Sequence, residues 1–360
     1  MNKKSSVFAI ASLFSGAIMG SGFASGKEIF VFFSRHGDRG MAGIAAAIVG
    51  FFLLGIMLMQ MSNRKSTDNI EKVICPFNRV IAQKAVGWTV TCSLFIVYAA
   101  MLAAAGAVVG AEFGMPAYIG AFCIGAVSAA TVAGGIEGLS GSLKRAVPIM
   151  LCAVLAIGIH IALNNPQQSA VSPSGEISKE NWFVSAMLYL SYNMTVAMPA
   201  LCAAGKNCDS FGKRVLGCGG AVLALGAGAA VIHCMLMTNL QYAQNTPMPI
   251  LLFANDISRG TKAVCSFMLI LSIYCAASNC LYGVSKKLCL IKFTKLNSIL
   301  FPTVVGCMLS FAGFSNIVRY IYPLQGAAGF LMLVLIFTSY VKQISESESK
   351  SKSKSAALYK

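Results

Sequence analysis

The chain has 360 residues, of which 57% are hydrophobic and 11% are charged, and its mean hydropathy is +0.72. Soluble domains average about 45–50% apolar and about 25% charged residues, so this composition excludes an ordinary soluble enzyme. The net charge is +16, but the 28 Lys and Arg residues are scattered singly and form no basic face interleaved with aromatics. A nucleic-acid partner is therefore excluded, and the lipid bilayer is the expected surrounding of the chain.

Long apolar runs separated by short polar loops predict an all-α polytopic membrane protein with about ten transmembrane helices. A helix needs about 20 residues to cross a hydrocarbon core of about 30 Å. The spans are expected over residues 7–33, 41–62, 86–112, 117–135, 146–163, 182–204, 215–238, 261–285, 297–313 and 317–341. A short external helix is expected over residues 249–258.

The basic residues predict the direction of these spans. With the N-terminus inside, 21 Lys and Arg residues fall in inside segments and 6 fall outside, with Lys27 left within the first span. This asymmetry predicts a multi-pass protein of the bacterial cytoplasmic membrane with both termini cytoplasmic. The start of the chain resembles a cleavable signal, but the apolar pattern resumes over residues 29–33 and favours a retained span. Residues 343–360 alternate Ser with Glu or Lys and predict a disordered cytoplasmic tail.

The 13 cysteines and 3 histidines predict neither a disulfide framework nor a metal centre. Most cysteines sit in apolar stretches, where Cys behaves as a small hydrophobe, and Cys202 and Cys208 lack C-x-x-C spacing. The histidines are far apart in the sequence and join no ligand motif. No metal centre and no organic cofactor are expected.

Glycines interrupt the first span at Gly16, Gly20, Gly22 and Gly26, beside Ser21. Glycine lets a helix unwind, and unwound backbone at membrane depth persists only where it lines protein or a water-filled cavity. There, freed N–H groups bind an anion such as a carboxylate, and freed carbonyls bind a cation. The alternative is small-xxx-small packing, in which the glycines simply let helices approach closely.

Lys27 and Glu28 follow these glycines within the same span. An ionisable group inside a span costs at least about 2.5–3.5 kcal/mol, so such groups pair or face an aqueous path. One interpretation is an ion pair near the interface, between the two residues or with Arg35. The other is a gate or a proton-responsive carboxylate near the external vestibule.

The sixth span is expected to be interrupted as well, because Tyr192 and Asn193 are polar and Pro199 lacks a backbone donor. Interrupted helices at corresponding positions of two halves indicate a transporter binding site. In span eight, polar side chains would complete a sodium site or form ordinary interhelical hydrogen bonds, namely Ser272, Ser278 and Asn279. Tyr98 in span three either points its hydroxyl at a substrate or fills the core.

These segments carry a family resemblance. The run G-S-G-F-A-S-G-K-E-I from Gly20 to Ile29 resembles the hallmark of the YkvI-like bacterial membrane proteins. Similar later motifs are Ser191-Tyr192-Asn193 with Pro199, and Tyr322-Pro323-Leu324 with Gly326. Lys27 departs from the family pattern, in which Gln is expected, and this leaves the charge of that position open. The family is similar in turn to the amino acid–polyamine–organocation superfamily, whose LeuT-type fold has five-plus-five inverted repeats with broken helices 1 and 6.

The resemblance implies one transmembrane transporter domain over residues 1–342, with repeats over about 7–163 and 182–341. It implies a secondary transporter, an ion-coupled symporter of an amino acid or related small solute that works by alternating access. An uncoupled facilitator or exchanger of another small solute is the alternative. The implied substrate-binding residues are Gly20, Ser21, Gly22, Phe23, Tyr98, Tyr192 and Asn193.

In this resemblance, the N–H groups of Ser21 and Gly22 and the Tyr98 hydroxyl would bind a substrate carboxylate. The implied sodium site consists of Gly16, Met19, Ser278 and the neighbouring Asn279. Span five lacks the Lys that replaces Na⁺ in some proton-coupled members, so Na⁺ stays open, and H⁺ coupling through Glu28 beside Lys27 is the rival. An enzyme is not expected, because the sequence contains no H-E-x-x-H, no G-x-S-x-G and no Asp pair within a span.

Overall fold

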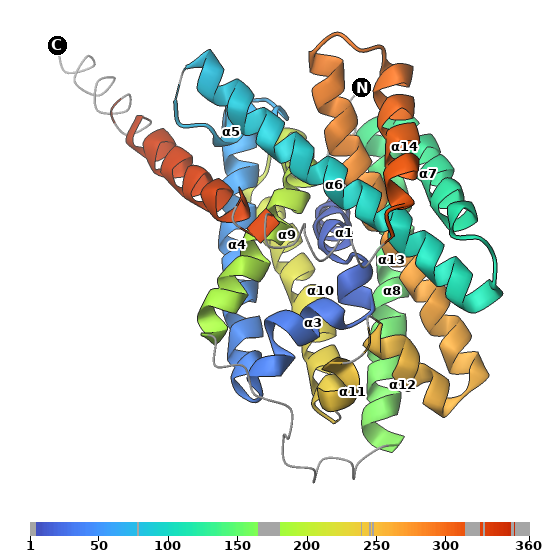
Figure 1. Cartoon of the computed structure of the whole chain (residues 1–360). Helices are drawn as coiled ribbons and strands as arrows, with labels where there is room; N and C mark the ends of the chain where they lie inside the picture. Colours follow the sequence, from blue (N-terminus) through green and yellow to red (C-terminus); the bar gives the residue numbers. More distant parts are fainter. Residues whose placement is uncertain are drawn as a thin grey trace, which may run out of the picture.

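The computed structural model describes residues 5–77, 79–164, 181–238, 240–244, 246, 248–313, 325–326, 328–346 and 349. For residues 161–164, 241–242 and 256–257 only the backbone is described. The expectations for the motif at Tyr322, for the first residues of the tenth span and for tail residues 347–348 and 350–360 lie outside the described residues. Residues 343–346, expected to belong to the disordered tail, instead continue the last helix. Within the described part of the chain, every regular element is a helix, as predicted (Figure 1).

The helices match the ten predicted spans. The first span consists of α1 (Val7–Ile18), α2 (Ser21–Ala24) and α3 (Lys27–Phe32). The others are α4 (Arg39–Arg64), α6 (Val80–Phe113), α7 (Ala117–Ala133), α8 (Gly135–Asn164), α9 (Trp182–Lys206), α10 (Phe211–Met237), α13 (Arg259–Leu290), α14 (Lys295–Ser310) and the last helix, Ala328–Glu346. Among the described residues, 7 helices are long and apolar enough to cross a membrane, and the shorter apolar helices α1, α7 and α14 occupy the remaining spans.

Short helices connect some of these spans. They are the 3₁₀ helix η1 (Ser34–His36), α5 (Ile70–Ile74), α11 (Leu240–Gln244) and α12 (Pro249–Ile257). The last of these is the external helix expected over residues 249–258, and Pro249 stands at its first position, where a missing N–H costs nothing.

The first predicted span is broken, but the sixth is not. α9 is helical over all its 25 residues, with Pro199 inside it, so the expected interruption there is corrected. Two side chains support this helix near the proline: the Thr195 hydroxyl donates to the carbonyl of Ser191, and Asn279 Nδ2 donates to the carbonyl of Val196 at 2.7 Å. Bonds of this kind let a membrane helix tolerate a proline without unwinding.

The packing of the spans agrees with an inverted repeat. In the bundle, α4 (span two) packs on α9 (span six), and α10 (span seven) packs on α1 (span one). If each span is matched with the span five places along the chain, each of these two contacts becomes the other. The contacts of α6 with α7 and of α13 with α14 exchange in the same way. Spans two and seven, α4 and α10, pack on each other, as do spans four and nine, α7 and α14. This is the arrangement that two repeats related by a pseudo-two-fold axis would produce.

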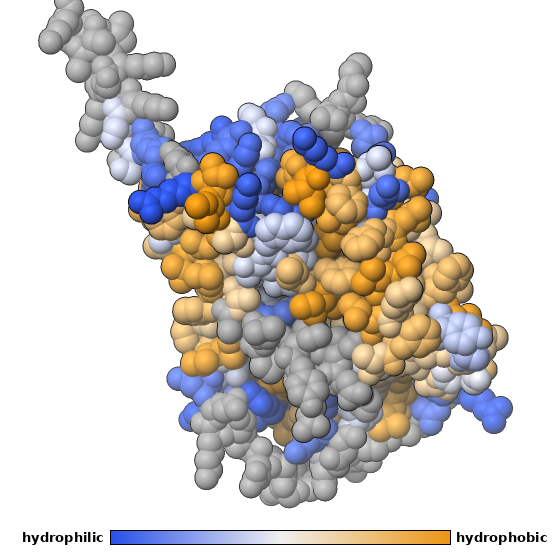
Figure 2. Space-filling view, turned by 45° about the horizontal axis from the view of Figure 1, so that its top comes forward, coloured by the Kyte–Doolittle hydropathy of each residue, from blue (hydrophilic) through white to orange (hydrophobic). Residues whose placement is uncertain are grey.

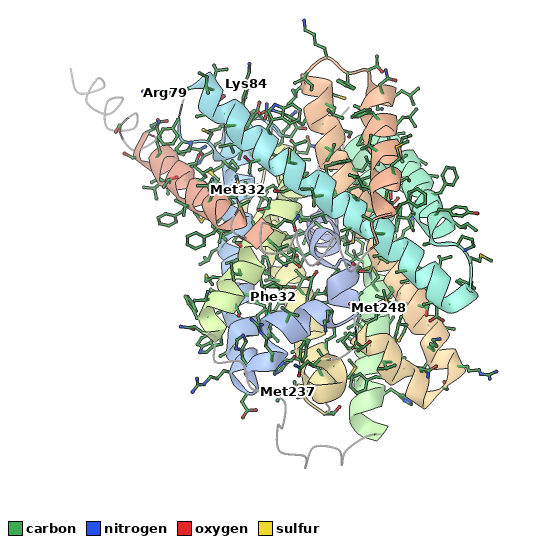
Figure 3. The ribbon with its side chains drawn as sticks, in the orientation of Figure 1. Phe32, Arg79, Lys84, Met237, Met248 and Met332 are labelled. Atoms are coloured by element: carbon green, nitrogen blue, oxygen red, sulfur yellow. The ribbon has the colours of Figure 1, made fainter. Side chains whose placement is uncertain are left out.

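The segments predicted to be cytoplasmic meet at one end of the molecule. The N–H of Ser5 donates to the carbonyl of Asn207, and Lys342 Nζ donates to the carbonyl of Pro76 at 2.7 Å. Arg79 and Lys84 lie at this end, and Met237 and Met248 lie at the opposite end (Figure 3). The first described residues and the end of the last helix therefore lie on the same side, as an even number of spans requires.

The surface between the two ends is apolar. A broad hydrophobic band separates polar regions at either end of the molecule (Figure 2). Large exposed apolar side chains on several helices contribute to the apolar surface, among them Val49, Leu53, Leu223, Phe267, Phe301 and Phe337. A soluble monomer rarely exposes a contiguous apolar surface of this extent, so this surface faces lipid.

Candidate functional site

The first span unwinds at Met19 and Gly20. α1 ends at Ile18, Met19 has ψ 72°, and the N–H of Gly20 turns back to the carbonyl of Ile18 at 2.7 Å. Ser272 on α13 faces this break, and its Oγ lies 2.6 Å from the carbonyl oxygen of Met19 and 2.8 Å from that of Gly20. Helix α13 therefore supplies the hydrogen-bond donor that the break takes away from the helix.

The glycines of the first span have different roles. A Cβ on Gly16 would lie 2.8 Å from Leu143 on α8, so Gly16 allows close helix packing. A Cβ on Gly22 would collide with the carboxyl group of Glu28, which therefore folds back over the α2 backbone. Gly26 has φ +80°, a left-handed conformation that turns the chain between α2 and α3 and that favours glycine. Both interpretations of the glycine pattern thus apply, at different positions.

A cavity lies beside the break, lined by residues of the first, third, sixth, eighth and tenth spans. The lining residues are Ala17, Ile18, Gly20, Glu28, Val97, Ala100, Met101, Tyr192, Asn193, Val196, Ala276 and Gln325. The space open to the centre of a water molecule is about 20 Å³, compared with roughly 10–15 Å³ for one water. The site is therefore small in this conformation, and most of its lining is apolar.

Two amide side chains on the cavity have a defined orientation. Asn193 Nδ2 donates to the carbonyl of Tyr189 at 3.1 Å, and Gln325 Nε2 donates to the carbonyl of Ser93 at 3.1 Å. Because only the nitrogen side of an amide can pair with a carbonyl, the oxygen side of each is left to accept hydrogen bonds. Gln325 is 6% exposed, and its Oε1 has no hydrogen-bond partner among the described residues.

Aromatic side chains cover the cavity next to Tyr192. The Phe32 ring on α3 stacks on the Tyr192 ring with 5.9 Å between centroids and an interplanar angle of 28°. Tyr189 contacts both rings and also the rings of Phe33 and Phe51. Phe32 lies between α3 and α9 (Figure 3), so this cluster ties the outer part of the first span to the sixth.

The structure brings three of the predicted substrate residues to the cavity, Gly20, Tyr192 and Asn193. Phe23 packs instead towards α10, where a Cβ on Gly228 would lie 3.3 Å from its ring. Ser21 and Gly22 lie in the first turn of α2 beside the break but do not line the cavity. The N–H groups of this turn are free of the preceding helix, because the break removes the carbonyls that would accept from them.

Tyr98, expected at the substrate, faces away from the cavity. Its hydroxyl donates to Thr303 on α14 at 3.4 Å, and its ring contacts Gly306 on the same helix. On α6 the cavity is lined by Val97 and Met101, which share one helix face, whereas Tyr98 is rotated by about 100° from Val97. Tyr98 therefore joins α6 to α14.

Lys27 and Glu28 point in different directions. Lys27 Nζ donates to the carbonyl of Gln244 on α11 at 3.0 Å and lies 5.1 Å from the centre of the Phe30 ring. Glu28 is 6% exposed and lines the cavity. The two residues therefore do not share one site: Lys27 links α3 to α11, and Glu28 lines the cavity.

The predicted ion-binding residues belong to two helices that contact each other: Gly16 and Met19 to α1 and its end, and Ser278 and Asn279 to α13. Ser278 and Asn279 are fully buried, and neither Ser278 Oγ nor Asn279 Oδ1 has a hydrogen-bond partner among the described residues. Asn279 Nδ2 is held by Val196, a cavity residue, so its oxygen is directed elsewhere. Unpaired buried oxygens of this kind are costly unless an ion or a water molecule binds them.

Sequence reasoning missed Gln325. It left two roles open for Ser272, and the structure shows the interhelical hydrogen bond. Gln325 stands in an apolar span directly after the motif at Tyr322 that was used for the family resemblance, and a buried polar side chain in a span is itself a functional signal. The apolar lining from α6 gave no signal, because Val97, Ala100 and Met101 look like any other core residues.

A second polar cluster lies at the end that is predicted to be cytoplasmic. We call α5 and its flanking residues 65–77 the α5 strap. Asp68 in this strap pairs with Lys206 at the end of α9 (3.2 Å) and with Lys286 near the end of α13 (2.6 Å), and Glu71 pairs with Lys287. Burial raises the pKa of the Asp68 carboxyl, but hydrogen bonds and charges from Lys286 and Lys206 together hold that pKa below its usual value of 3.8.

Known proteins resemble this chain in sequence and in fold, although no family model matches it. The chain is 23% identical over 329 residues to the uncharacterized membrane protein YkvI of Bacillus subtilis (strain 168), covering 90% of this chain and 93% of that protein. It superimposes on MhsT in complex with L-phenylalanine with a TM-score of 0.70 and 15% identity, covering 93% of this chain and 89% of MhsT.

A further match is a Na⁺-coupled sialic acid symporter in a substrate-bound outward-open state. Its TM-score is 0.67 at 12% identity, and the alignment covers 92% of this chain and 78% of the symporter. These similarities confirm two expectations: the chain is homologous to YkvI, and its fold is the LeuT type found in membrane transporters.

Proposed function

We propose that the protein is a secondary active transporter that carries an amino acid or a related small solute across the membrane by alternating access. The observation that carries this proposal is the cavity beside the broken first span, where residues of five spans converge in the centre of the fold. A ligand site at a discontinuous helix near mid-membrane is the arrangement that secondary transporters use. The transporters MhsT and the sialic acid symporter, which share this fold, support the same conclusion.

Solute would bind with its body against the apolar cavity wall and its polar groups towards the break. Glu28, Asn193 and Gln325 supply hydrogen-bonding groups from three different spans. The N–H groups of Ser21 and Gly22 at the start of α2 are available to a carboxylate that reaches past Gly20. Tyr192, held by its stack with Phe32, would close over the solute.

A coupling ion is part of the proposal. Na⁺ would be held by the oxygens of Ser278 and Asn279 and by carbonyls of Gly16 and Met19; when bound, it would tie α13 to α1 in the solute-binding conformation. A carbonyl oxygen has two lone pairs, so Met19 can serve an ion beside its bond from Ser272. The position of Glu28 on the cavity supports H⁺ coupling as the second candidate.

Alternating access requires both ends of the site to open in turn. In this conformation the α5 strap ties the ends of α9 and α13 together at one end. At the other end the N–H of Ile250 on α12 donates to the carbonyl of Ser25 at 3.0 Å and so links α12 to the first span. We propose that these contacts break alternately, with the strap on the cytoplasmic side of a bacterial inner membrane and both termini there.

The experiment that tests the proposal is thermal stabilisation of the purified full-length chain by single amino acids, with and without Na⁺, at pH 5.5 and 7.5. A solute that binds only the folded state at 100 times its Kd adds about 2.7 kcal/mol to the stability. A shift with one class of amino acid that grows with Na⁺ supports sodium symport, and one that depends on pH supports Glu28. If neither amino acids nor other small organic solutes shift the unfolding temperature, the proposed function is wrong.

A further inference from the structure

The polar side chains of the cavity offer hydrogen-bond acceptors. Gln325 Oε1 has no hydrogen-bond partner among the described residues, and the Nε2 of the same amide donates to the carbonyl of Ser93. Asn193 is oriented in the same sense by its bond to Tyr189. Two amide side chains from different spans, α9 and the last span, thus turn their acceptor sides away from the backbone carbonyls that hold them. A solute that binds them has to supply donors.

The charged residues of the lining also favour a solute that supplies hydrogen-bond donors. Among the described residues that line the cavity, Glu28 is the one acidic residue, and none is Lys, Arg or His. The nearest basic neighbour in sequence, Lys27, is directed to the carbonyls of Ala243 and Gln244 on α11. A carboxylate has about four lone-pair sites, so Glu28 can accept a further hydrogen bond from a solute beside its contacts within the protein.

We infer that the cavity binds a solute through a protonated amino group, with Glu28 as the counter-ion and Gln325 Oε1 as a second acceptor. An ammonium group carries three donors and no acceptor, which complements a wall of oxygens. This inference rests on the proposed function and names the chemical class of its solute. Gln325 is the residue that sets this specificity against carboxylates, because a carboxylate placed against Oε1 would leave two acceptors facing each other.

The apolar part of the lining limits what the ammonium group is attached to. Val97, Met101 and Val196 surround the remaining space, and the cavity holds little more than one water-sized group in this conformation. A small aliphatic primary amine is therefore the solute that best matches this conformation, and an amino acid requires the cavity to widen.

The test uses L-alanine and two analogues that each lack one of its charged groups. Ethylamine keeps the amine without the carboxylate, and propionate keeps the carboxylate without the amine. We expect L-alanine and ethylamine to stabilise the purified full-length chain against thermal unfolding and propionate to have no effect. Titration of the unfolding temperature gives an apparent Kd for each compound.

Two variants assign the effect to the named atoms. Glu28→Gln and Gln325→Leu are expected to weaken ethylamine binding by about 10-fold to 100-fold, the range for a lost hydrogen bond to a charged group. Gln60→Leu is the matched control, because Gln60 also has a buried side-chain oxygen without a described partner but lies on α4, outside the lining. If Glu28→Gln does not fold, the affinity of Gln325→Leu for ethylamine decides whether the ammonium site is correctly assigned.

The outcomes separate this inference from the proposed function. Stabilisation by propionate and not by ethylamine, or unchanged ethylamine binding in Gln325→Leu, overturns the assignment of an ammonium site. Stabilisation by a neutral solute when neither amine binds also overturns it and leaves the transporter proposal standing. Only failure of every small organic solute contradicts both.

Discussion

Replacement of Ser272 by Ala tests whether α13 stabilises the break in the first span. The Ser272 hydroxyl has one proton and lies within hydrogen-bond distance of two carbonyl oxygens, those of Met19 and Gly20. Gly20 has a second donor, the N–H of Ala24 at 3.0 Å. The carbonyl of Met19 has no hydrogen-bond donor besides Ser272 among the described residues, so Ser272→Ala leaves this buried carbonyl unpaired.

The expected cost follows from that carbonyl. Leaving one buried acceptor without a partner costs about 1–3 kcal/mol, which is about 5-fold to 150-fold in the folding equilibrium. The lower part of the range applies if a water molecule from the adjacent cavity replaces the hydroxyl. With an unfolding entropy of about 2.1 cal/mol/K per residue, the unfolding temperature of a chain of this size is expected to fall by about 1–4 °C.

The assay is thermal unfolding followed with a thiol-reactive dye, because Cys202, Cys275 and Cys280 are fully buried and become reactive on unfolding. Ser285→Ala on the same helix is the control: its Oγ donates to the carbonyl of Tyr282 at 3.0 Å, which lies within the same helix. If Ser272→Ala unfolds at no lower temperature than Ser285→Ala, the break does not depend on α13 and the reasoning is refuted.

Three further predictions concern the ion, the α5 strap and the scaffold. Ser278→Ala is expected to abolish the sodium dependence of solute binding, measured by thermal stabilisation with and without Na⁺, because it removes a buried oxygen that the ion would use. The wild-type chain should lose stability as the pH falls below about 4, because Lys286 and Lys206 hold the folded-state pKa of Asp68 below its value of 3.8. In Asp68→Asn this loss should be smaller in an unfolding series from pH 7 to pH 3. Tyr98→Phe should leave solute affinity unchanged, because its hydroxyl bonds Thr303 and not the cavity.

Each of these has a control. Ser266→Ala removes a buried hydroxyl from the same helix as Ser278, but one that bonds Lys262 within that helix, and it should keep the sodium dependence. Glu346→Gln removes an exposed partner of Lys342 and should lose as much stability between pH 7 and pH 3 as the wild type does. The sodium prediction is contradicted if Ser278→Ala keeps its sodium dependence, and the acid prediction if Asp68→Asn loses as much stability at low pH as the wild type. Lost solute binding in Tyr98→Phe contradicts the third prediction.

Much of the fold could be predicted from sequence because its signals are local. Apolar runs suffice for ten spans, and the glycines from Gly16 to Gly26 predict a break that the structure has at Met19 and Gly20. The same kind of signal failed at Pro199, because the residue that keeps α9 helical there, Asn279, comes from a helix 83 positions away in sequence.

The cavity was only partly predictable for a similar reason. Tyr98 and Met101 lie in the same helix, and their sequence does not say which face of α6 meets the break; the structure turns Met101 towards it and Tyr98 to α14. Gln325 was detectable as a polar residue in an apolar span, but its orientation depends on Ser93, which lies 232 positions earlier.

Solute uptake into proteoliposomes tests the central claim most directly, with a uniformly labelled amino-acid mixture and an inward gradient of Na⁺ or H⁺. Ala100→Phe fills the cavity from α6, whereas Ala45→Phe makes the same change at an exposed site on α4. The account predicts gradient-dependent uptake by the wild type and by Ala45→Phe and none by a folded Ala100→Phe. Uptake by Ala100→Phe at the wild-type rate would show that solute does not pass through this cavity.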